Sequence, residues 1–210
     1  PLLGVNRDIF IRSLMLQLVF FSITLQGARL GDATVAANAL LLNGLLLAAH
    51  ALDGLAHAVE ALCGHAIGAR DRHALRRSML VACGWSLMAS TAFALLFLFG
   101  GHLFVEMQTD IASVRETAFQ YLPYLALLPL IAVWSYLLDG LFIGATRARE
   151  MRNAMLISVV IAFPAAWALH GYGNHGLWIS FLLFMVLRSL TLGVYAWKMQ
   201  RRDEWFTPRA

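Results

Sequence analysis

Six long apolar stretches constrain the fold of this chain more than any other feature. A transmembrane helix needs about 20 apolar residues, because each residue advances about 1.5 Å through a hydrocarbon core about 30 Å thick. Such stretches lie at about 9–28, 33–68, 78–99, 119–145, 154–169 and 176–197 of the 210 residues. They leave no room for a soluble domain. The sequence therefore predicts an all-α integral membrane protein, with six transmembrane helices in one unit over residues 1–210.

The charge content agrees with this prediction and limits the partners. Only 13% of the residues are charged, against about a quarter in soluble domains, and the formal net charge is +4. The basic residues lie in short clusters between apolar stretches, so we expect membrane lipid and no nucleic acid as a partner. The chain begins at Pro1 without an initiator Met, and we expect it to be part of a longer polypeptide.

The distribution of Lys and Arg predicts the orientation, since cytoplasmic loops of membrane proteins are enriched in both. Arg29 and Arg115 fall on one side, and Arg188 falls inside the last stretch. Thirteen cations fall on the other side: Arg7, Arg12, Arg70, Arg72, Arg76, Arg77, Arg147, Arg149, Arg152, Lys198, Arg201, Arg202 and Arg209. We therefore expect a multi-pass protein with both termini in the cytoplasm.

The connection at 100–118 alternates apolar and charged residues and predicts a short amphipathic helix at the membrane surface.

Polar residues follow one face of the second stretch. His50, Asp53, His57 and Glu60 are spaced by three, four and three residues, and Asn43 lies seven residues before His50. Ionisable groups inside a membrane are costly, so they persist with a partner, with water or for a function. One interpretation is a wet stripe facing a cavity, where carboxylates and imidazoles exchange protons. The other is a structural seam that packs helices together.

Asp139 and Arg188 lie at similar depths in the fourth and sixth stretches, so we expect them to pair. Asp53 and Asp139 both occur in Leu-Asp-Gly, and Pro or Gly residues interrupt the stretches that carry them.

The sequence predicts no metal site. His50 and His57 lie two turns apart, and no further residues at metal-ligand spacing accompany them. Phosphate-binding loops, nucleophile elbows and zinc-protease motifs are missing, so we expect a protein that is not an enzyme and has no catalytic residues or cofactor.

Several short segments carry a family resemblance. LDGLFIGATR at 138–147 and EMRN at 150–153 resemble the tenth span, and the loop that follows it, of the multidrug and toxic compound extrusion (MATE) family, especially of its DinF-type bacterial branch. The seventh and eighth spans of the branch are matched by NRDIFIR at 6–12, QGARLGD at 26–32, LDG at 52–54 and EAL at 60–62. The resemblance covers essentially the whole chain.

This resemblance implies a twelve-span antiporter of the bacterial inner membrane, built from two six-helix lobes around a cavity. The chain would be the C-terminal lobe, and the N-terminal lobe would be its missing partner. Such proteins export amphipathic, often cationic, compounds in exchange for H⁺ or Na⁺. Some relatives carry a Glu in the seventh span, where this chain offers only Gln17 and Gln26. That departure argues against an intact second-lobe cation site and leaves Asp139 as its only matching carboxylate.

The leading hypothesis is multidrug efflux coupled to a cation, with H⁺ favoured over Na⁺. Asp53 and Asp139 are the main cavity candidates, Asn43, His50, His57, Glu60 and Arg188 are further ones, and Gln17 and Gln26 are candidate substrate-lining residues. Two alternatives stay open. One is a lipid-linked oligosaccharide flippase of the same superfamily, although Arg188 as the one cation deep in a span argues against its more basic cavity. The other is a membrane scaffold subunit that transports nothing.

Overall fold

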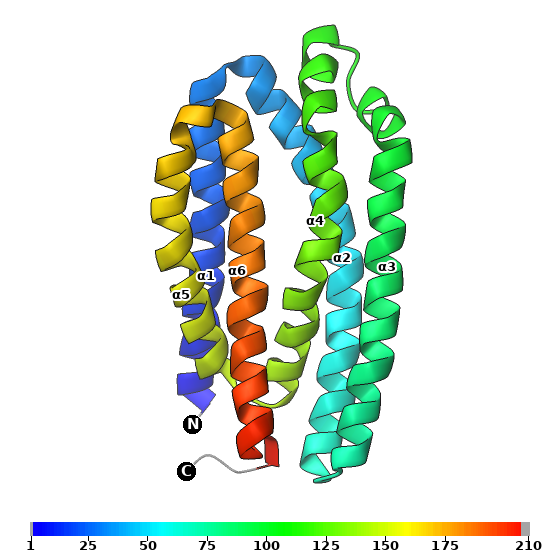
Figure 1. Cartoon of the computed structure of the whole chain (residues 1–210), viewed down its shortest axis with the longest axis vertical. Coiled ribbons are helices and arrows are strands. Elements are labelled where there is room, and N and C mark those ends of the chain that lie inside the picture. The colour runs from blue at the N-terminus through cyan, green and yellow to red at the C-terminus, as the bar shows by residue number, and fades with distance from the viewer. Residues whose placement is uncertain (1, 207–210) are drawn as a thin grey trace.

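In a computed structural model that describes residues 2–206, the chain folds into long α-helices joined by short connections (Figure 1). The helices are α1 (Leu2–Gly27), α2 (Asp32–Gly68), α3 (Arg72–Glu106), α4 (Ala112–Gly144), α5 (Ala148–Ala168) and α6 (Gly173–Arg202). Three 3₁₀ turns, η1 (Ala28–Leu30), η2 (Leu169–Tyr172) and η3 (Glu204–Phe206), complete the described part. The prediction of an all-α membrane fold is confirmed.

Each α-helix contains one predicted apolar stretch, and most helices extend beyond it. α3 begins at Arg72, whereas its apolar stretch begins near residue 78. Each apolar stretch marks the part of its helix that lies inside the hydrocarbon core of the membrane. The helix continues beyond it into the polar interface, because the backbone hydrogen bonds of the helix persist there. By length and composition, the described residues contain five helical segments able to cross a membrane, and the fifth, Ala148–Arg202, includes both α5 and α6.

The prediction of a separate amphipathic helix at 100–118 is wrong. α3 continues to Glu106, a short turn follows, and α4 begins at Ala112. Arg115 holds this turn, since its guanidinium donates to the Thr109 carbonyl at 2.6 Å and to the Asp110 carboxylate at 3.0 Å. The alternation of apolar and charged residues reflects the ends of two long helices.

The two basic connections lie at the same end of the molecule as both chain ends (Figure 1). The α2–α3 connection turns at Arg70, whose φ is +55°, and Asp71 caps α3 by accepting from the Ala74 amide at 2.9 Å. At the opposite end, Gly31 and Gly173 adopt positive φ, which residues with side chains rarely adopt. Arg209 lies outside the described residues. That the basic end faces the cytoplasm stays a prediction from charge.

Ion pairs tie the helices together at this basic end. Arg152 of α5 donates to Asp8 of α1 at 2.6 Å, and Arg72 of α3 pairs with Asp203 just after α6. Arg147 lies 3.8 Å from Glu150 and donates to the backbone carbonyl of Glu204. Burial lowers the pKa of the Arg147 guanidinium, and the charge of Glu204 partly raises it. Several of the basic residues therefore hold helices together, in addition to indicating how the chain is oriented in the membrane.

The helices form two groups of three. α2, α3 and α4 pack together, α1, α5 and α6 form the second group, and contacts between α4 and α6 join the two (Figure 1). Pro123 and Pro129 lie inside α4, and the helix continues through both. α4 is therefore the central element of the fold.

Glycines allow α4 to approach α2 closely. A Cβ atom on Gly140 would lie 2.3 Å from the Ala56 carbonyl oxygen, and one on Gly144 would lie 2.4 Å from the Glu60 carbonyl oxygen. Spaced by four residues, the two glycines form a small-residue seam of the kind that brings membrane helices together. Gly140 thus has a packing role.

We expect Gly140→Ala to destabilise the fold by about 1–3 kcal/mol, because the added methyl would force α2 and α4 apart. Gly54→Ala is the matched control, since no atom lies within 4 Å of the position where its Cβ would be. That control should be neutral or stabilising by up to about 1 kcal/mol. Unfolding of both variants in detergent micelles checks this, and equal stabilities would contradict the close approach.

Candidate functional site

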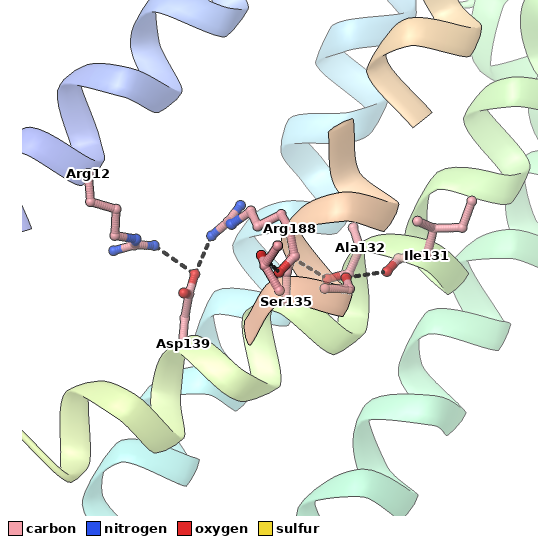
Figure 2. Close-up of polar contacts among 8 residues, drawn as sticks. Arg12, Ile131, Ala132, Ser135, Asp139 and Arg188 are labelled. Carbon is pink, nitrogen blue, oxygen red and sulfur yellow. Dashed lines mark hydrogen bonds and ion pairs between the residues drawn. The ribbon is translucent and has the colours of Figure 1, made fainter. Parts of the chain in front are cut away.

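A buried carboxylate on α4 is shared by two arginines from different helices (Figure 2). Asp139 is 5% exposed, and its Oδ2 atom accepts hydrogen bonds from Arg12 of α1 at 2.6 Å and from Arg188 of α6. Figure 2 shows the two guanidinium groups reaching the same oxygen from either side. The Asp139–Arg188 pair predicted from equal depth is present, and Arg12 is an additional member.

This triad carries an excess of positive charge. Two arginines face one carboxylate, and Arg188 is only 2% exposed. The buried Asp139 Oδ1 atom and the Nε atoms of Arg12 and Arg188 have no hydrogen-bond partner among the described residues. A buried charge that loses its partner is strongly destabilising. The carboxylate is therefore first of all a structural counter-charge for two cations.

Tyr136 lies one helical turn before Asp139 and faces the same group. The guanidinium carbon of Arg188 is 5.8 Å from the centre of its ring, a cation–π distance. Its hydroxyl is within electrostatic range of Asp139, Arg12 and also Asp53. Tyr136 therefore belongs to the surroundings of the buried triad.

The polar residues of α2 lie on a face that this chain leaves open. His50, Asp53 and His57 are exposed and Glu60 is half-buried, while Leu52, Ala56 and Val59 on the other face are buried. Asp53 is within electrostatic range of His50, His57, Asp139 and Arg188. His57 Nδ1 lies 3.3 Å from Glu60 Oε2, and His50 Nδ1 lies 2.6 Å from the Leu46 carbonyl. The structure thus brings Asp53 near the triad.

Three other candidates lie elsewhere. Asn43 donates to Gln108 Oε1, in the connection between α3 and α4, at 3.3 Å, and so belongs to another contact. Gln17 is exposed and lines none of the described cavities. Gln26 is half-buried and lines a cavity of about 450 Å³ between α1, α5 and α6, together with Phe163, Trp167, Phe181 and Phe184. Of the two glutamines, Gln26 alone lines this cavity.

A second buried polar contact was not predicted from the sequence. Buried Asn38 of α2 and Asn174 of α6 exchange two hydrogen bonds, at 2.7 and 3.0 Å, and Trp178 donates to Asn38 Oδ1 at 3.0 Å. Asparagine carries no charge, so a search for ionisable groups passes over it. Within residues 2–206, no group of three or more His, Cys, Asp or Glu side chains is placed to hold a metal ion.

We expect Asp139→Asn to destabilise the fold by about 3–5 kcal/mol, because two guanidinium groups would lose their counter-charge. Arg12→Gln should cost less, since it leaves a balanced Asp139–Arg188 pair. The exposed Asp53→Asn should change stability by less than about 0.5 kcal/mol. Denaturant titration in micelles measures the free energy of unfolding of each of the three variants. An Asp139→Asn protein as stable as Asp53→Asn would refute the structural role of the Asp139 carboxylate.

Comparisons with known proteins show which family this chain resembles. The MatE family model matches residues 9–168. DNA damage-inducible protein F of Escherichia coli (strain K12) is 42% identical over 205 residues, which make up 98% of this chain and 45% of that protein. The chain therefore spans about half the length of this curated relative.

Solved structures show the same fold. A MOP superfamily transporter from Pyrococcus furiosus, described as having a binding pocket of reverse polarity, superposes with a TM-score of 0.81 at 20% identity, over 98% of this chain and 47% of that one. A MATE protein in a bent conformation gives 0.80 at 22% identity, over 96% and 46% of the two chains. A multidrug resistance MATE transporter in an outward-facing conformation gives 0.81 at 20%, over 98% and 47%.

Proposed function

The chain belongs to the MatE family, and from this premise we propose that it forms one six-helix half of a multidrug exporter. Such an exporter moves amphipathic organic compounds, mainly cations, out across the bacterial inner membrane in exchange for protons. The second half would come from the same polypeptide, which is supported by the chain spanning about half of its curated relative. Both termini of this half would lie in the cytoplasm, as the clustered arginines predict.

The observation that carries the proposal is the open polar face of α2 beside the buried triad. In a scaffold subunit, His50, Asp53 and His57 would be sealed against neighbouring helices, because an unpaired ionisable group in lipid is costly. In this chain all three are exposed. A cavity shared with the second half would keep them hydrated, which favours transport.

We assign proton coupling to Asp53 and assign Asp139 to the structure. Asp139 is already paired with two arginines, so the net positive charge of the triad would repel a cationic substrate. Asp53 has no ion-pair or hydrogen-bond partner within the described part of the chain. One helical turn on either side of it lie His50 and His57, whose imidazole rings can pass protons to and from water. Na⁺ coupling would instead require several oxygen ligands around Asp53.

One observation favours the flippase alternative. The sequence offers Arg188 as the one cation deep in a span, but the structure adds Arg12 on the same carboxylate. The triad has a net positive charge, which would attract the diphosphate of a lipid-linked oligosaccharide. We keep this as the second candidate, because the triad is buried and the open face of α2 carries the opposite charge.

We expect Asp53→Asn to reduce pH-gradient-driven efflux of a fluorescent organic cation at least tenfold, because the side chain no longer binds and releases a proton. Asp53→Glu should keep part of the activity. Glu106→Gln is the control, since it removes an exposed carboxylate at the end of α3 and should have no effect. The measurement uses everted membrane vesicles containing the polypeptide that carries this chain.

Two results would decide against this proposal. Full gradient-driven efflux by Asp53→Asn would remove Asp53 from the coupling mechanism. If the unmodified protein moves no organic cation but transfers a lipid-linked sugar diphosphate between leaflets, the second candidate replaces the first.

A further inference from the structure

A groove runs between α3 and α6 at the end of the molecule that holds both chain ends. Its volume is about 850 Å³, and its walls come from α3, α6 and the η3 turn, with Leu138 and Leu141 of α4 at its base. This is in the size range of small-molecule sites in proteins. The function proposed above does not use it.

The groove is polar at its mouth and apolar deeper in. On α3, Arg72 and Arg76 lie in the first turns, and Met79 and Cys83 follow one and two turns later. α6 runs the opposite way, with Trp197 deeper and Gln200 near its end. The charged groups therefore lie at the membrane surface and the apolar groups lie at the depth of the leaflet.

The mouth carries a net positive charge. Arg72 pairs with Asp203 and lies 5.7 Å from the centre of the Phe206 ring. Arg76 is exposed and forms no ion pair among residues 2–206. The guanidinium of Arg201 lies 4.1 Å from the centre of the Trp197 ring and adds a further positive charge beside the groove. Asp203 offsets only part of this charge.

The groove lies on a different face of α4 from the charged triad. Leu138 and Leu141 contribute to the groove, whereas the Asp139 side chain between them points to Arg12 and Arg188. In a membrane, the groove would open between α3 and α6 toward lipid. It is therefore separate from the charged triad.

We propose that this groove binds an anionic phospholipid from the leaflet at the basic end of the molecule. Its phosphate lies at Arg76 and Arg72, and an acyl chain lies along Met79, Leu138 and Trp197. Basic pockets between membrane helices on the cytoplasmic side bind acidic headgroups in this manner. A free phosphate would leave the apolar depth empty, and a zwitterionic lipid would gain little from the positive mouth. The inference needs the helices to cross a membrane and does not depend on what is transported.

Phosphatidylglycerol and phosphatidylcholine are the two probes, titrated separately into the purified polypeptide that carries this chain and followed by native mass spectrometry. We expect tighter binding of phosphatidylglycerol, and a roughly fivefold loss of its affinity in Arg76→Gln. Arg77→Gln is the matched control, because Arg77 is the exposed neighbouring arginine outside the groove lining. It should lose less than twofold. Arg76→Gln should retain the fold, since no ion pair is broken.

A second variant tests the apolar part. Met79→Trp narrows the groove without changing its charge and should weaken phosphatidylglycerol binding while leaving cation efflux unchanged. The proposal is overturned if Arg76→Gln binds phosphatidylglycerol normally, if Arg77→Gln loses as much as Arg76→Gln, if phosphatidylcholine binds equally well, or if glycerol phosphate without acyl chains binds as tightly as the lipid.

Discussion

The pairing of charges inside the membrane is the constraint on which the rest of this structure depends. One carboxylate, Asp139, neutralises part of the charge of Arg12 and Arg188 and so connects α1, α4 and α6. An unpaired charge at that depth would cost several kcal/mol. On α6, Arg188 lies between Met185 and Leu192, which belong to two separate hydrophobic clusters. The triad thus fixes how the two groups of helices meet.

The triad holds α4 in place, and the different faces of this helix then make different contacts. Gly140 and Gly144 bring it against α2, Asp139 turns toward the arginines, and Leu138 faces the groove beside α3. The close contact at Gly140 also sets the position of α2. As a result, Asp53 lies near the triad without being bound by it, which is what a carboxylate must do if it is to gain and lose a proton.

Sequence reasoning reached the parts of this arrangement that depend on hydrophobic length and helical period. It located the apolar part of each helix, the shared face of His50, Asp53 and His57, and the pairing of Asp139 with Arg188, but most helices extend several residues beyond the predicted stretches. It missed Arg12, because counting cations by membrane side assigned that residue to water. In the structure its flexible side chain reaches a buried carboxylate. Long arginine side chains commonly place their charge away from their own backbone level.

Three other features of the structure were not predicted correctly from the sequence. The role of Gly140 depends on which helix faces it, and the Asn38–Asn174 contact joins residues 136 positions apart, so neither follows from local pattern. The 100–118 stretch has helical spacing because it contains the ends of two helices, and spacing alone does not show where one ends.

Thiol labelling can show whether the polar face of α2 is exposed to water in the membrane. Single cysteines would replace His50, Asp53, His57 or the buried Ala48 in a protein whose Cys63 and Cys83 are serine, and would react with a membrane-impermeant maleimide in everted vesicles. We expect labelling at positions 50, 53 and 57 and none at 48. Protection of all four positions would contradict this expectation, because a sealed seam would then hold the polar residues.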